Sequence, residues 1–95
     1  MYEELLKHFS KNNIELQYKI GGFRVDFLVK VSNREIVLEC DGKTYHQSDE
    51  AHAYDLYRQK ELENLGYIVY RMWSTDWFQR PEIEMKKFLN FVETV

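Results

Sequence analysis

Acidic side chains and one histidine gather in a short stretch of the sequence, VLECDGKTYH at residues 37–46. Glu39 and Asp41 are separated by one residue, so on a strand both carboxylates point to the same side. Like charges this close raise each other's pKa unless a cation lies between them. Asp41-Gly42 is also a strong turn signal. A solvated turn explains Asp41 well, but it leaves Glu39 unexplained.

A third carboxylate interrupts an apolar run upstream, where Asp26 lies in VDFLV at residues 25–29. A charged residue inside a strand is costly unless it is paired or bound to metal. Pairing with Arg24 on the same face is one explanation. If Asp26 instead lies beside Glu39, the two carboxylates form an oxygen site suited to Mg²⁺, which takes few protein ligands. Mn²⁺ is the alternative ion for such a site.

A possible base and its partner follow this stretch. His46 comes five residues after Asp41, and its ordinary pKa suits a general base beside a metal-bound water. A zinc site is less favoured, because the chain has no CxxC or HxxxH spacing. A solvated loop histidine stays an open alternative. Asp55 either forms an ordinary surface ion pair with Arg58 or orients His46, as carboxylates orient imidazoles at metal sites.

Hydrophobic periodicity, helix-capping residues and turn signals predict the elements that must position these residues. Together they indicate a helix at 2–9, strands at 14–20, 23–31 and 35–40, a helix at about 48–65, a strand at 67–73, a loop at 74–80 and a helix from Pro81. For the long helix, Ser48 suits the N-cap and Gly66 the left-handed end. Three consecutive strands can form a meander, and the long helix permits a crossover to the fourth. The sequence therefore predicts an α/β fold in the order α-β-β-β-α-β-α, with a mixed four-stranded sheet flanked by helices.

Two finer predictions concern side-chain placement. Strict alternation in strand 23–31 divides its side chains between two faces: Phe23, Val25, Phe27 and Val29 on one, and Arg24, Asp26 and Leu28 on the other. Trp73 ends a strand and is expected in the core. Trp77 and Phe78 are expected in an open loop, where aromatic side chains can stack on bases or wedge between them.

Length and composition restrict the class of protein. The chain has 95 residues, which is one domain, and 44% of them are hydrophobic. No apolar run approaches a membrane span, and no signal peptide opens the chain. The single Cys40 predicts a reducing, cytoplasmic setting. A net charge of −3 by itself argues against nucleic-acid binding, but carboxylates that hold a divalent ion would also make the total negative.

Three segments occur in an order and spacing that is typical of one known superfamily: GGFRVDF, VLECDGKTYH and YDLYRQKELENLGYIVYRMWSTDWF. Together they resemble the very-short-patch-repair-like branch of the PD-(D/E)XK restriction-endonuclease superfamily. The nearest likeness is to the C-terminal endonuclease-like domain of bacterial superfamily 1 helicase-related proteins. The similarity covers about residues 3–93. It implies a restriction-endonuclease-like three-layer fold, with residues 1–95 as one domain that belongs to a larger protein.

The resemblance also implies metal-binding roles. Asp26 matches the strand aspartate that binds metal, and Glu39 matches the acidic residue of the next strand. The carbonyl oxygen of Cys40 is a candidate for a further ligand. Asp41 stands where the wider superfamily places a lysine that activates the attacking water, which is a feature of this branch and puts the lysine's role in doubt here.

The remaining catalytic roles also come from the resemblance. His46 matches the catalytic histidine of the branch, and Asp55 matches the helix aspartate near it. The pattern includes a glutamate on the N-terminal helix. Glu3 and Glu4 are both present, and Glu3 is preferred because it lies nearer the apolar stripe.

These roles predict a Mg²⁺-dependent DNA endonuclease that acts in repair, restriction or helicase-linked processing. Arg24, Lys43 and Arg58 are the candidates for contacts with DNA phosphates. A helicase domain, in the same or another chain, is the expected partner. The alternative is a non-catalytic DNA- or partner-binding accessory domain of a helicase-like protein, which the acidic pI of about 5.6 favours. A dimerisation domain is disfavoured, because the chain has no heptad pattern.

Overall fold

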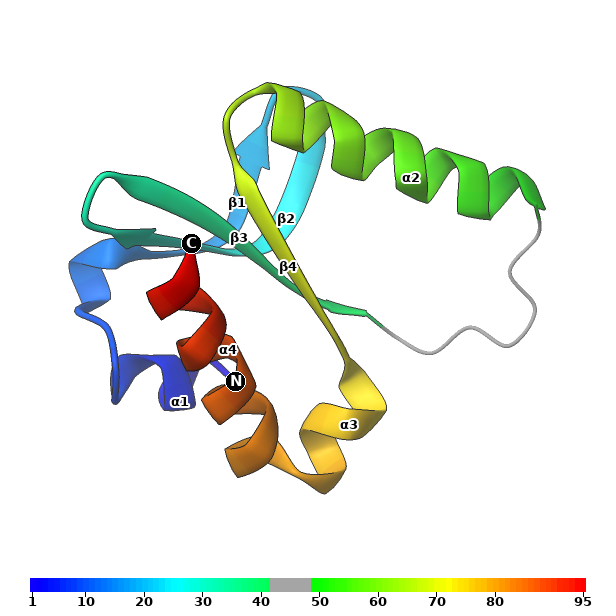
Figure 1. The fold of residues 1–95 in the computed structure, drawn as a ribbon. Coiled ribbons are helices and arrows are strands. Elements are labelled where there is room, and N and C mark those ends of the chain that lie inside the picture. Colours follow the sequence, from blue (N-terminus) through cyan, green and yellow to red (C-terminus); the bar gives the residue numbers. More distant parts are fainter. Residues whose placement is uncertain (42–48) are drawn as a thin grey trace.

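A computed structural model gives the fold of the chain and describes residues 1–41 and 49–95 (Figure 1). Lys43 and His46 lie outside the described residues. The elements are, in chain order, α1 (Tyr2–Leu6), the 3₁₀ turn η1 (Lys11–Asn13), β1 (Ile14–Ile20), β2 (Phe23–Val31), β3 (Arg34–Asp41), α2 (Asp49–Asn64), β4 (Ile68–Trp73), α3 (Ser74–Gln79) and α4 (Pro81–Thr94). The predicted order of helices and strands is confirmed, with α3 as an addition.

The four strands form one mixed sheet in the order β1-β2-β3-β4. The first three strands pair antiparallel as a meander, and β4 pairs parallel with β3 after the chain crosses over through α2. Helix α2 covers one face of this sheet, while α1, α3 and α4 lie on the other side (Figure 1). The α/β fold with helices on both faces, expected from the sequence, is therefore confirmed, and it is compatible with a restriction-endonuclease-like architecture.

The larger core lies between the sheet and the helices α1, α3 and α4. Met85, Phe88 and Val92 form the buried stripe of α4, as its helical spacing predicts. The ring of Phe88 contacts those of Phe9 and Tyr70, at centroid distances of 6.1 and 5.2 Å. Because α4 begins at Pro81, whose fixed φ suits a first helical position, its start is also as predicted.

The smaller core lies beneath α2, where Leu62 packs with Ile20, Val25, Leu28 and Val37. Leu62 is fully buried, whereas most side chains of α2 are exposed. Gly66, with φ of +97°, follows the helix in the left-handed conformation that the sequence predicts. Among the side chains of α2 that the structure describes, apolar burial thus fixes the C-terminal half of the helix on the sheet.

The predicted side-chain alternation in β2 is wrong. Val25 and Leu28 both pack in the core beneath α2, whereas Phe27 and Val29 pack on the opposite face. The phase therefore changes near Asp26. Gln17 of β1 lies between the partners of Phe27 and Val25, has φ of +48° and has no partner in the register. A left-handed residue bends its strand and interrupts the ladder locally, and β2 changes phase at the same point.

The predicted placement of the tryptophans is also wrong. Residues 74–79 form helix α3, which turns Trp77 into the larger core, where only 6% of it stays exposed. Trp73 is 51% exposed, and Phe78 is 80% exposed. Because α3 begins directly after β4, the tryptophan of the helix packs in the larger core, and the tryptophan at the end of the strand stays half exposed. The helices of residues 1–41 and 49–95 include none that is long and apolar enough to cross a membrane.

Candidate active site

Asp26 and Glu39 occupy neighbouring positions of adjacent strands. Phe27 of β2 pairs with Leu38 of β3, so Asp26 and Glu39 follow on the two strands at the end of that ladder. The Cys40 backbone N–H donates to Asp26 Oδ2 at 2.9 Å, and Gln17 Nε2 lies 3.5 Å from Asp26 Oδ1. Within the described residues Asp26 thus takes its hydrogen bonds from these groups, and the alternative of an ion pair with Arg24 is not observed.

Glu39 is a buried carboxylate, only 5% exposed, on the face of the sheet that α2 covers. Arg58 of α2 donates through Nη1 to Glu39 Oε1, and through Nη2 to the backbone oxygen of Arg24 at 2.9 Å. Burial raises the pKa of Glu39, the Arg58 guanidinium lowers it, and the charges of Asp26 and Asp41 raise it further. The net direction is upward, because loss of solvation outweighs the single ion pair.

A second arginine, Arg71 of β4, connects three polar side chains. It donates through Nε to Asp41 Oδ2 at 2.8 Å and through Nη2 to Asp55 Oδ1 at 2.8 Å. Its Nη1 lies 3.2 Å from Gln59 Oε1. Burial lowers the pKa of Arg71, but its hydrogen bonds to Asp41 and Asp55 and their negative charges outweigh burial and raise it. Arg71 therefore joins the end of β3 to helix α2 as a permanent cation.

The ion pairing of Asp55 differs from the simplest prediction. The spacing on α2 predicts a surface pair with Arg58, but the partner of Asp55 is Arg71, at 2.7 Å, and Arg58 pairs with Glu39. Each arginine reaches across from one element to another, instead of along the helix. Arg71 is not among the residues singled out from the sequence. Its signal is of the same kind as that of Asp26, a charged residue inside an apolar strand, YIVYRMW.

The charges of this cluster do not balance within the described residues. Its carboxylates belong to four residues and its guanidinium groups to two, so two negative charges remain uncompensated: Asp26, Glu39, Asp41 and Asp55 against Arg58 and Arg71. An excess of this size matches one divalent cation.

The ligand chemistry suits Mg²⁺ better than a soft metal. Asp26 and Glu39 offer carboxylate oxygens, and two carboxylates with waters are a usual Mg²⁺ site. Residues 1–41 and 49–95 contain no group of three or more His, Cys, Asp or Glu side chains that could hold a metal. Burial raises the pKa of the Cys40 thiol, and this side chain packs against the larger core. Only the backbone carbonyl of Cys40 is therefore a candidate ligand.

The other predicted residues lie farther from this cluster or are not described. Glu3 is exposed on α1, on the opposite side of the sheet from α2, while Glu4 is half-buried and pairs with Lys7 at 3.0 Å. His46 and Lys43 lie outside the described residues. Arg24 is exposed near the turn between β1 and β2.

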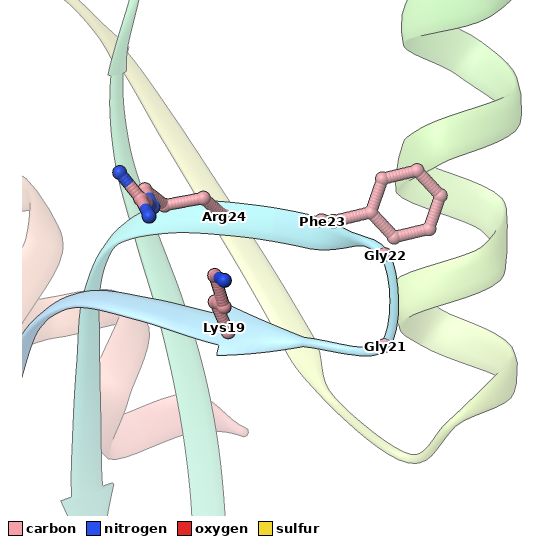
Figure 2. Close-up of a pocket in the computed structure, with 5 residues that line it drawn as sticks. All are labelled: Lys19, Gly21, Gly22, Phe23 and Arg24. Atoms are coloured by element: carbon pink, nitrogen blue, oxygen red, sulfur yellow. The ribbon is translucent and has the colours of Figure 1, made fainter.

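A hollow of about 310 Å³ lies at this turn, lined by Lys19, Gly21, Gly22, Phe23 and Arg24. Figure 2 shows Phe23 pointing toward α2, with Arg24 on the other side of the hairpin. The register places Lys19 directly opposite Arg24. The hollow therefore has two cationic side chains in its wall, and its two glycines leave the tip of the hairpin without side chains.

Comparison with known families identifies the kind of domain. The model of a restriction-endonuclease-like family, REase_MTES_1575, matches residues 1–92. Because the match covers nearly the whole chain, the protein belongs to this family. Among curated proteins and solved structures, none matches the chain significantly. Family membership indicates a nuclease at the family level.

Proposed function

We propose that this restriction-endonuclease-like domain is a metal-dependent DNA endonuclease that hydrolyses phosphodiester bonds. The observation that carries the proposal is the placement of Asp26 and Glu39 at neighbouring positions of two strands. They lie in a cluster with two uncompensated negative charges among the described residues. A strand position is rigid, so both carboxylates are positioned before substrate arrives.

Asp26, Glu39 and the Cys40 carbonyl would hold Mg²⁺ or Mn²⁺. When bound, such an ion supplies a Lewis acid beside the scissile phosphate. The chain's own residues prepare this site: the Cys40 N–H holds the carboxylate of Asp26, and Arg58 holds that of Glu39. Family resemblance supports His46 as the base that takes a proton from the attacking water.

Arg71 and its two carboxylate partners have a positioning role in this proposal. Asp41 and Asp55 come from β3 and α2, and Arg71 binds both. This ties the strand before residues 42–48 to the helix after them. His46 belongs to that connecting segment, so the pair of contacts sets the distance between the segment's two ends.

The test is cleavage of supercoiled plasmid DNA by the full chain with Mg²⁺ or Mn²⁺. Wild type is expected to nick or linearise the plasmid, and Asp26→Asn is expected to lose activity by at least about 100-fold, as loss of a group that stabilises the transition state commonly does. Lys86→Ala, on the far side of the sheet, is the control and is expected to cut normally. Equal cleavage by wild type and Asp26→Asn would overturn the proposal.

The second candidate is a non-catalytic DNA- or partner-binding domain. The observation in its favour is that Arg58 already pairs with Glu39, which supplies the carboxylate with a cation from within the chain. This candidate predicts DNA binding without strand breaks, whereas the endonuclease proposal predicts both.

The setting of the activity follows from the family likeness and the composition. The resemblance to helicase-associated domains supports a helicase domain, in the same or another chain, as the partner that delivers DNA. It also supports a role in repair, restriction or helicase-linked processing. A single cysteine, Cys40, suits a cytoplasmic location, because it needs no oxidising compartment.

A further inference from the structure

Two like charges face each other at the tip of the β1–β2 hairpin. Lys19 and Arg24 are cross-strand partners, and both are exposed. Like charges at directly opposite positions destabilise a sheet. In the part of the chain that the structure describes, no carboxylate forms a salt bridge with either side chain. The pair therefore has a cost in folding that the described contacts do not offset.

The turn between these two cations leaves its backbone accessible to a ligand. Gly21 has φ of +59°, which favours glycine, but Gly22 has no such need. A Cβ added at Gly22 would meet no atom within 4 Å, so packing does not exclude a side chain either. The two glycines leave the backbone bare beside the hollow of about 310 Å³ that Lys19 and Arg24 line. Cations around a bare backbone suit a phosphate group.

A row of aromatic rings leads away from the other side of the hairpin. Phe23 contacts Tyr57 of α2 at a centroid distance of 6.3 Å, and Tyr57 lies 6.3 Å from Tyr54. Figure 2 shows the ring of Phe23 directed toward this helix. Tyr57 is 56% exposed and Tyr54 59% exposed, so neither ring is used in a core. Exposed aromatic rings are a usual platform for unpaired bases, whose faces are free to stack, and here the row lies across the hairpin from the two cations.

The hairpin tip is directly connected to the candidate active site. Arg58, the neighbour of Tyr57, donates to the backbone oxygen of Arg24 and also to Glu39. Arg24 precedes Asp26 by two residues in β2, roughly 7 Å along an extended strand. A strand of DNA held at the tip would therefore lie next to the carboxylates.

We propose that the hairpin tip and the aromatic row form a binding surface for an unpaired DNA strand. A phosphate binds between Lys19 and Arg24, and bases stack on Tyr57 and Tyr54. The inference rests on the proposed function in taking DNA as the ligand, and it adds the substrate class: DNA with a single-stranded or frayed segment at the site. A closed duplex offers phosphates to the tip, but its base faces are not free for the tyrosines.

The test is fluorescence anisotropy with a labelled oligothymidine and with a duplex hairpin of similar length, both in EDTA so that no cleavage occurs. Wild type is expected to bind the single strand at least about tenfold more tightly than the duplex, and Tyr57→Leu, which keeps apolar bulk but lacks a π-face, is expected to lose about tenfold on the single strand. Leu65→Ala, which removes another exposed apolar side chain at the end of α2, is the matched control and should bind as wild type.

The cations are tested by salt dependence and stability together. Lys19→Ala and Arg24→Ala should each weaken binding and reduce the slope of log K against log salt by about 0.7, the value for one phosphate contact with a single strand. Lys86→Ala, on α4, removes the same charge elsewhere and should change neither quantity. Lys19→Ala should also unfold at a temperature no lower than wild type, because it relieves a repulsion.

The proposal is overturned if the duplex binds as tightly as the single strand. It is equally overturned if Tyr57→Leu, Lys19→Ala and Arg24→Ala bind the single strand as Lys86→Ala does. Because the measurement is made without metal, a lack of nuclease activity would leave its result unaffected. The proposed catalytic function and this binding surface therefore fail separately.

Discussion

Glu39 shows that a buried charged residue on a strand needs a partner of opposite charge. It is buried, and its negative charge depends on Arg58, which α2 brings over the sheet. Removing one partner of a buried ion pair leaves the other uncompensated. Such a residue is rarely retained for stability alone, since apolar side chains of similar size often do as well. This is why the carboxylate is better explained by chemistry than by folding.

The raised pKa of Glu39 predicts a pH-dependent stability for the metal-free protein. The folded state holds the proton of Glu39 more tightly than the unfolded state, whose pKa is about 4.5. As the pH rises through and above this value, ionisation in the folded state becomes more costly than in the unfolded state. The unfolding free energy of wild type, relative to Glu39→Gln, should therefore fall as the pH rises from about 4.5 toward neutrality.

Urea denaturation of both proteins in EDTA over this pH range provides the measurement. Lys86→Gln is the matched control, since it removes a charge on the far side of the sheet. A difference between wild type and Glu39→Gln that stays constant, or that grows in favour of wild type with rising pH, would contradict the prediction.

Single residues also set the limit of prediction from sequence. Asp26 and Glu39 stand out, because carboxylates in apolar strands are anomalous. Arg71 is the same kind of anomaly, but its partners are distant in sequence. Asp41 lies 30 positions before it and Asp55 lies 16 before it. The parallel pairing of β3 with β4 brings Asp41 to Arg71, and the packing of α2 on the sheet brings Asp55. Local spacing encodes neither arrangement.

At the scale of elements, helix α2 differs from α4 in how it is attached. The buried stripe of α4 packs along its length, whereas α2 buries Leu62 near one end. Besides Leu62 and the contact of Tyr57 with Phe23, its attachment in the described residues is polar, through Arg58 to Glu39 and through Asp55 and Gln59 to Arg71. The helix that covers the candidate site is thus held by the same charges that shape the site.

This attachment predicts a local effect of removing Arg71. In Arg71→Gln, the N-terminal half of α2 should exchange its amide hydrogens faster, because Asp41, Asp55 and Gln59 lose their shared partner. Amides of α4 should keep their protection, since that helix packs in the other core. Hydrogen exchange followed by mass spectrometry separates the two helices.

Lys87→Gln is the matched control for this measurement. It removes the exposed surface pair with Glu84, at 3.2 Å, and should leave α2 unaffected. Uniform loss of protection over both helices in Arg71→Gln would show that Arg71 stabilises the fold as a whole, contrary to the prediction.

The elements also show which parts of the fold the sequence encodes locally. The strands and α4 repeat their apolar pattern, whereas α2 is marked by the residues at its two ends, and these elements are found as predicted. Helix α3 has six residues, too few to establish a periodicity, and the sequence predicts a loop there. The bend near Gln17 has no signal, because glutamine rarely takes positive φ and glycine is absent there.

In the whole molecule, the two sides of the sheet differ in composition: one carries most of the core, and the other carries the candidate site. The side of α1, α3 and α4 carries the larger core and most of the buried apolar residues. The side that α2 covers (Figure 1) carries Glu39 with its partner Arg58, and also the exposed tyrosines of α2. Arg71 joins the end of β3 to the same helix. This division is consistent with the proposed function despite the net charge of −3. In that proposal, the acidic residues at the site would bind the metal, and Lys19 and Arg24 would contact the DNA strand.

A Mn²⁺ titration tests most directly the central claim that Asp26 and Glu39 jointly hold a catalytic divalent ion. Isothermal titration calorimetry of the full chain, without DNA, should show about one bound ion per chain for wild type, which matches the charge excess among the described residues of the cluster. Asp26→Asn and Glu39→Gln should each bind at least about tenfold more weakly, as expected on loss of a ligand. Glu82→Gln, which removes an exposed carboxylate on α4, should bind as wild type. Equal Mn²⁺ uptake by wild type and both site variants would contradict the account.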